Sequence, residues 1–102
     1  MTPKIIYMTN IDRRYFMMRR ALDELIADGE MPASSQVVKT EDGSVWSASW
    51  EEKLRGSALV MIRFMGNTIR TKFWTACMHF LSREGIPYYM DAAGSAEEEC
   101  IE

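Results

Sequence analysis

An arginine stands inside the most apolar segment of the chain. Residues 58–66 read Ala-Leu-Val-Met-Ile-Arg-Phe-Met-Gly, and Arg63 is the one charged side chain among them. A charge within a buried strand is costly unless it is paired or reaches the end of the strand. Arg63 is therefore the first candidate for a structural ion pair or for contact with an anionic ligand. The alternative is that its stem lies along the sheet and its guanidinium stays in water.

Four small or polar residues could share a site with Arg63. Thr9 and Asn10 lie at the carboxyl end of the first predicted strand, and Gly66 and Asn67 directly follow the strand that contains Arg63. In open α/β sheets, ligands bind outside the carboxyl ends of the strands, at the point where the strand order reverses. The helix N-termini beside these loops could hold an anion. The same residue types are also ordinary capping and turn residues, so both interpretations stay open.

The sequence offers no catalytic or metal-binding set. His79 is the only histidine, and Cys77 lies two positions before it. Residues two apart on a helix point in nearly opposite directions, so we expect a surface position for His79 rather than a shared metal site. Without a Cys-x-x-Cys pair a closed zinc site is not expected, and no glycine-rich phosphate motif occurs. We therefore expect no catalytic residues, no metal ligands and no cofactor in this domain.

Composition and charge narrow the class of protein. The chain has 102 residues, 47% of them hydrophobic, and a net charge of −3. Nucleic-acid binding usually requires a strong basic excess, so we expect no nucleic-acid partner. No apolar segment approaches the ~18–20 residues that cross a bilayer, so no membrane span is expected. The first residues do not resemble a signal peptide, and the two cysteines form no disulfide framework. We expect a cytoplasmic protein.

Apolar periodicity predicts strands that alternate with helices. Such an alternation implies a mostly parallel sheet with right-handed crossovers and helices on both faces. The expected class is α/β, a three-layer half of a flavodoxin-like or Rossmann-like fold with four strands in the order 2-1-3-4. Strands are predicted over residues 4–9, 36–40, 58–65 and 87–91, and helices over about 11–28, 49–56 and 67–84.

Local motifs suggest where these elements begin and turn. Asn10 or Asp12 could cap the first helix, and Ser49 with Glu52 matches a capping box for the second. Asp42-Gly43 is typical of a hairpin turn leading into residues 44–48, which conflicts with an all-parallel sheet. The sequence leaves open whether 36–48 is a hairpin or one strand and a loop.

The chain reads as one domain followed by a short tail. Residues 1–94 form a single predicted α/β domain, and residues 95–102, with Glu97-Glu98-Glu99, form an acidic flexible tail. Three tryptophans, Trp46, Trp50 and Trp74, could line a surface for another domain.

Three segments together resemble a known family. They are Lys4-Ile5-Ile6-Tyr7-Met8-Thr9-Asn10 before a helix, the apolar run that ends in Arg63-Phe64-Met65-Gly66, and Glu84-Gly85-Ile86-Pro87 before a strand. In this pattern the chain resembles the N-terminal region of CobN, the large subunit of aerobic cobaltochelatase, which is related to the H subunit of magnesium chelatase. The resemblance covers most of residues 4–94.

The resemblance implies a role in tetrapyrrole metabolism. Members of that family insert Co²⁺ or Mg²⁺ into a corrin or porphyrin ring, and separate AAA-type subunits hydrolyse ATP. The chain would then be a fragment of a larger subunit, and its partners would be the remainder of that subunit and the ATPase subunits. About 100 residues cannot enclose a tetrapyrrole and also supply the bases that chelation requires. We therefore expect a non-catalytic scaffold, gate or docking domain. The alternative is a stand-alone flavodoxin-like module that binds a small ligand or a protein.

Overall fold

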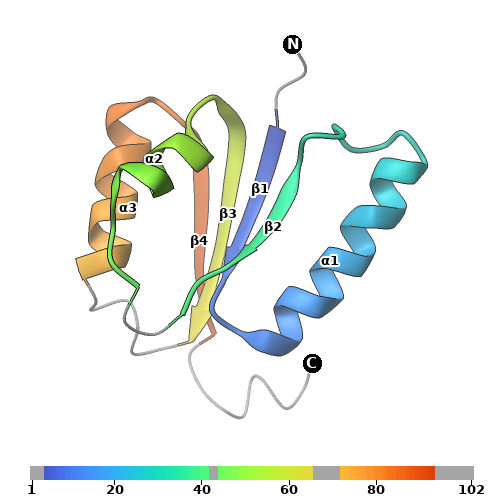
Figure 1. Ribbon diagram of the computed structural model, residues 1–102, viewed down its shortest axis with the longest axis horizontal. Coiled ribbons are helices and arrows are strands. Elements are labelled where there is room, and N and C mark those ends of the chain that lie inside the picture. Colours follow the sequence, from blue (N-terminus) through green and yellow to red (C-terminus); the bar gives the residue numbers. More distant parts are fainter. Residues whose placement is uncertain (1–3, 42–43, 66–71, 94–102) are drawn as a thin grey trace.

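The computed structural model describes residues 4–41, 44–65 and 72–93, which form a parallel sheet covered by helices (Figure 1). The four strands lie in the order β2-β1-β3-β4, and each neighbouring pair is parallel. The predicted strand order and α/β class are confirmed, and β3 lies between β1 and β4. The elements are β1 (Lys4–Thr9), α1 (Asp12–Ala27), β2 (Gln36–Lys39), α2 (Ala48–Leu54), β3 (Ser57–Met65), α3 (Lys72–Arg83) and β4 (Tyr88–Ala93).

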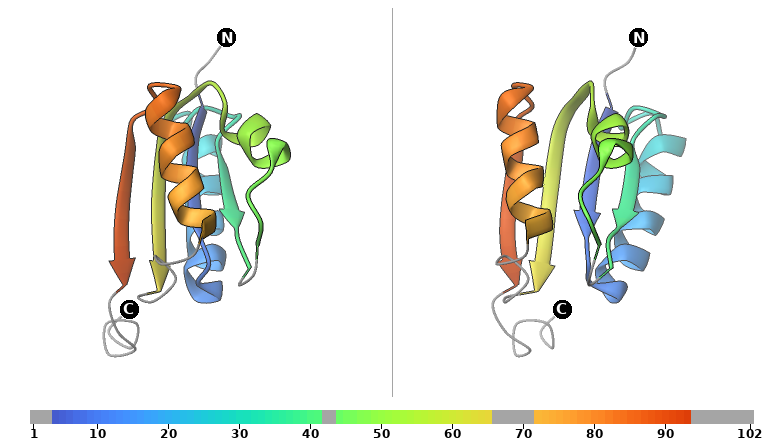
Figure 2. Two further views of the ribbon diagram at one scale, coloured as in Figure 1. Left: turned by 90° about the vertical axis from the view of Figure 1, so that its left-hand side faces the viewer. Right: turned by 60° about the vertical axis from the view of Figure 1, so that its left-hand side comes forward.

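The two faces of the sheet are covered to different extents. Figure 2 shows α2 and α3 on one face and α1 on the other. The face beneath α2 and α3 carries the closed core, because alternate residues of each strand point there. In β3 these are Val60, Ile62 and Phe64, each 1% exposed or less. The rest of this core comprises Ile6, Met8, Val38, Leu54, Phe73, Trp74, Cys77, Phe80, Leu81 and Ile86.

The α1 face is more open. α1 packs beside β1 and β2, and Met18, Leu22 and Leu25 are half-buried on its inner side. No residue of α1 is fully buried. On the strands farther from α1, Met61 is 36% exposed and Tyr89 is 63% exposed. Within the described ranges, α1 therefore shields only one half of this face.

Aromatic rings join α2 and the preceding loop to α3. Trp46 stacks on Trp50 with ring centroids 6.4 Å apart, and Phe73 meets Trp50 edge-on at 5.1 Å. The indole N–H of Trp46 donates to Glu51 Oε2 at 3.0 Å, which fixes the loop before α2. Trp74 is 3% exposed and stacks on Phe64. Burial excludes Trp74 from the expected outer surface, whereas Trp46 and Trp50 remain half-buried.

Several predicted boundaries are wrong. The N-cap of α1 is Ile11, which makes no side-chain cap bond; Asp12 is the first helical residue, and Asn10 lies before the cap. The N-cap of α2 is Ser47, so the Ser49–Glu52 capping box does not form. Packing against the core has overridden both local signals.

Of the two alternatives that the sequence leaves open for residues 36–48, the structure shows one strand followed by a loop. Residues 44–47 are not strand, and Ala48 begins α2. β2 pairs only with β1 in the described sheet. Asp42 and Gly43 lie outside the described residues. The segment 36–48 is thus one strand followed by a connection to a helix.

Two glycines lie at the C-terminal ends of helices α1 and α3. Gly29 and Gly85 have φ values of 77° and 70°, in the left-handed region that glycine adopts at low cost. The N–H of the following residue in each case reaches back five residues, from Glu30 to Leu25 O and from Ile86 to Leu81 O, both at 2.9 Å. This is the Schellman arrangement of a helix C-terminus.

Candidate functional site

Arg63 lies near the carboxyl end of the central strand, on the α1 face. Its backbone register partners are Thr9 on β1 and Asp91 on β4. The side chain is half-buried and lines an open recess of about 250 Å³ together with Arg14 of α1. The structure therefore brings two guanidinium groups from different elements to one hollow. Arginine always carries a charge and can bind a carboxylate through two parallel hydrogen bonds.

The apolar side of this recess is a row across three strands. Tyr7 of β1, Met61 of β3 and Tyr89 of β4 are in register, so their side chains stand on the same face. All three line the recess, and Met18 of α1 lines it too. Two phenol rings on either side of a methionine form an adaptable apolar platform. We give the name ring recess to the six lining residues whose side chains lie on the α1 face: Tyr7, Arg14, Met18, Met61, Arg63 and Tyr89.

The other predicted site residues have different positions. Thr9 is fully buried, and its Oγ1 accepts a hydrogen bond from the N–H of Ile11 at 3.1 Å. The Thr9 carbonyl accepts another from the N–H of Thr40 at 2.9 Å. Thr9 thus holds the turn from β1 into α1. Asn10 is half-buried in that turn. Gly66 and Asn67 lie outside the described residues.

A lysine near the same edge of the sheet is held by carboxylates. Lys39 Nζ lies 2.7 Å from Asp12 Oδ1 and 2.7 Å from Glu41 Oε1. The hydrogen bond to Asp12, with the one to Glu41, holds the pKa of Lys39 above its usual range. This cluster joins the end of β2 to the start of α1. Its lysine charge is balanced locally by these two carboxylates.

Sequence reasoning found Arg63 but missed the rest of the ring recess. The sequence alone does not single out Arg14, although it lies one turn before Met18, whose spacing marks the inner side of α1. The register of Tyr7, Met61 and Tyr89 is a property of strand pairing, and a single sequence does not display it. The alternation Met61-x-Arg63 was the available signal that these two side chains share a face.

The remaining chemical groups lie apart from the recess. Cys77 is fully buried in the core, and burial raises the pKa of its thiol to about 12. His79 is exposed, as expected. Among the described residues, no three histidine, cysteine or acidic side chains are grouped so that they could hold a metal. None of the helices in the described ranges is long and apolar enough to span a membrane.

Comparison with known proteins adds no relative. No family model matches the chain, and neither a curated protein nor a solved structure matches it.

Proposed function

We propose that the chain is the N-terminal α/β domain of a CobN-type cobalt or magnesium chelatase large subunit. In this role the ring recess holds one edge of a corrin or porphyrin, and other parts of the subunit perform metal insertion. One observation carries the proposal: Arg14 and Arg63 line the same hollow as the Tyr7–Met61–Tyr89 row. Tetrapyrroles combine a broad apolar ring with carboxylates at its rim, and the recess offers a complementary group for each.

The recess is suited to binding rather than to chelation chemistry. Chelation requires bases that remove pyrrole protons and ligands that deliver the metal. Arginine does not act as a base in proteins, and methionine sulfur is a weak acceptor. The open floor, with Tyr89 63% exposed, leaves one side of a bound ring accessible. A scaffold or gate that presents the ring to the rest of the subunit fits this geometry.

Titration with two corrins tests the proposal. Dicyanocobyrinic acid carries carboxylates, and dicyanocobinamide is a corrin in which they are amides. We expect amide shifts of Tyr7, Met61 and Arg63 to move with the acid, and at least tenfold weaker binding of the cobinamide. Charge-assisted hydrogen bonds contribute about 1.5–3 kcal/mol each, so Arg63→Gln and Arg14→Gln should each weaken acid binding about tenfold or more.

Arg20→Gln is the matched control. Arg20 is also on α1 but lines a different hollow, so its loss should leave the affinity unchanged. Circular dichroism checks that each variant folds. Equal affinities for both corrins, or shifts confined to residues away from the recess, would contradict the proposed function.

The stand-alone binding module remains a second candidate, favoured by the exposure of Met61 and Tyr89 on the half-covered face. An exposed apolar row of this kind is also typical of protein contacts. Under this candidate neither corrin binds, and Tyr89→Ser weakens a protein contact instead.

A further inference from the structure

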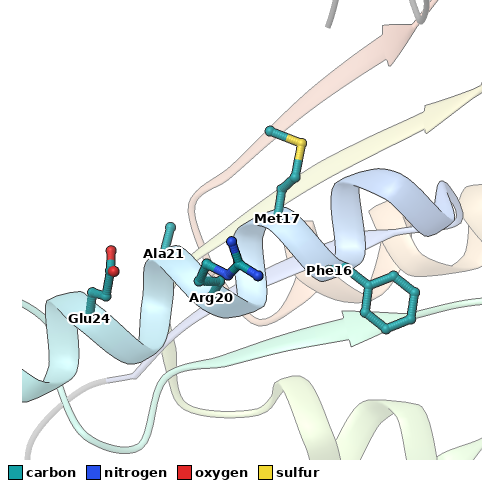
Figure 3. Close-up of a pocket in the computed structure, with 5 residues that line it drawn as sticks. All are labelled: Phe16, Met17, Arg20, Ala21 and Glu24. Atoms are coloured by element: carbon teal, nitrogen blue, oxygen red, sulfur yellow. The ribbon is translucent and has the colours of Figure 1, made fainter.

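The outer surface of α1 carries a second apolar patch, on the far side from the sheet. Phe16 is 67% exposed and Met17 is 49% exposed. A helix on the surface of a globular protein needs one apolar stripe, toward its core, and Met18, Leu22 and Leu25 already supply it. Figure 3 shows the side chains that line the outer hollow, with Met17, Ala21 and Glu24 along one flank, Phe16 on the other and Arg20 between them. We call these five residues the α1 patch.

Charge is divided along α1 in an unusual way. Exposed arginines lie at positions 13, 19 and 20 of α1, and exposed acids follow them at 23, 24 and 28. Apart from Asp12, this order opposes the helix macrodipole, which favours acids at the N-terminus and bases at the C-terminus. The last turn of α1 contains no basic residue. An antiparallel neighbour with the same charge order would place acids beside these bases and bases beside these acids.

We propose that the α1 patch binds the α1 patch of a second copy of this chain, with the two helices antiparallel about a two-fold axis. The favoured register sets Arg13 of one copy opposite Glu24 of the other. It places Met17 against Ala21 and the ring of Phe16 against the guanidinium of Arg20, a cation–π pair. Because a two-fold contact is self-complementary, each of these pairs occurs twice. A register centred on position 20 is disfavoured, since it would oppose Arg20 to its own copy.

The size of the contact predicts a weak, reversible dimer. A helix of 16 residues is about 24 Å long, and one helix pair buries less than the ~800 Å² per partner of a stable interface. We expect a dissociation constant on the order of 10–100 µM. Association should weaken as salt rises, because the charged pairs lie at a solvent-exposed rim.

Sedimentation equilibrium from about 5 to 500 µM tests the dimer. Glu24→Arg and Arg13→Glu should each weaken association about tenfold or more, because each opposes like charges twice. The double variant R13E/E24R restores opposite charges in both pairs and should return the dissociation constant to within about threefold of the wild type. Phe16→Ser should also weaken association.

Asp23→Arg supplies the matched control. It makes the same change of charge next to Glu24, but Asp23 lines a hollow beside β2 rather than the α1 patch, so association should be unaffected. A chain that stays monomeric to 500 µM would overturn the proposal. So would a dimer that survives Glu24→Arg and Phe16→Ser, or single charge reversals that the double variant does not rescue.

Discussion

Truncating two neighbouring residues of β3 should lower the free energy of unfolding by different amounts, because the two side chains lie on opposite faces of the sheet. Ile62 is 1% exposed beneath α2 and α3, and Met61 is 36% exposed on the α1 face. Ile62→Ala loses buried surface and leaves a cavity in a closed core, which costs about 3–4 kcal/mol of the free energy of unfolding. Met61→Ala loses only partial burial beside an open recess, at about 1 kcal/mol.

Urea titration followed by tryptophan fluorescence measures both losses. A chain of this size has a stability of about 5–15 kcal/mol, so both variants should remain folded at 20 °C. At about 4–8 °C per kcal/mol, Ile62→Ala should lower Tm by more than 10 °C. Ile62→Val removes a smaller group from the same buried position and should cost about 1 kcal/mol. It serves as a reference for the loss caused by Ile62→Ala. Losses for Ile62→Ala and Met61→Ala that agree within about 0.5 kcal/mol would refute the unequal covering of the faces.

Three further changes probe particular features. Gly85→Ala should cost about 1–2 kcal/mol, since an alanine there must adopt a positive φ with no neighbour within 4 Å to clash; urea unfolding measures it. Trp46→Phe should cost about 1–2 kcal/mol by leaving Glu51 without the indole donor at 3.0 Å; thermal unfolding measures it. In a Cys100→Ser background, Cys77 should react with a thiol reagent only on unfolding. Its folded pKa of about 12 lies above the unfolded value, so the unfolded chain loses the proton first. Stability should therefore fall by about 1.4 kcal/mol per pH unit from about pH 9 to 12, relative to Cys77→Ala.

The architecture could be predicted because strong, non-local constraints agree with the local pattern. The run 58–65 is apolar apart from Arg63, which favours a strand between parallel neighbours, and it forms most of the central strand β3. Alternation of strands with helices leaves few topologies once right-handed crossovers are required. The order 2-1-3-4 therefore followed from the sequence, without knowledge of any side-chain contact.

Signals that depend on a few residues were less informative. Asp42-Gly43 favours a hairpin locally, but a strand over 44–48 would have no place beside β2 once α2 packs Trp50 and Leu54 on the core. Ser49 and Glu52 match a capping box, yet α2 begins two residues before the predicted cap would allow. Local free energies of about 1 kcal/mol lose to the burial of several large side chains.

The site was predictable only in part for the same reason. Arg63 is conspicuous because its strand is otherwise apolar, so its charge demands an explanation. Arg14 has three other arginines near it on α1. It differs from them only in lying one turn before Met18, which is on the inner side of the helix. Its place in the ring recess depends on where α1 lies against the sheet, which is a tertiary property.

The two proposed contacts use different sides of the same helix, so they should be independent. Arg20 lies six positions after Arg14, which places their side chains about 120° apart around the helix axis at ~100° per residue. The first lines the ring recess and the second the α1 patch. Arg63→Gln should therefore leave the dissociation constant of the dimer unchanged, and Glu24→Arg should leave the affinity for dicyanocobyrinic acid unchanged. A change of more than about threefold in either cross-measurement would mean that α1 moves when one of its sides is occupied, contrary to the fixed position that both contacts assume.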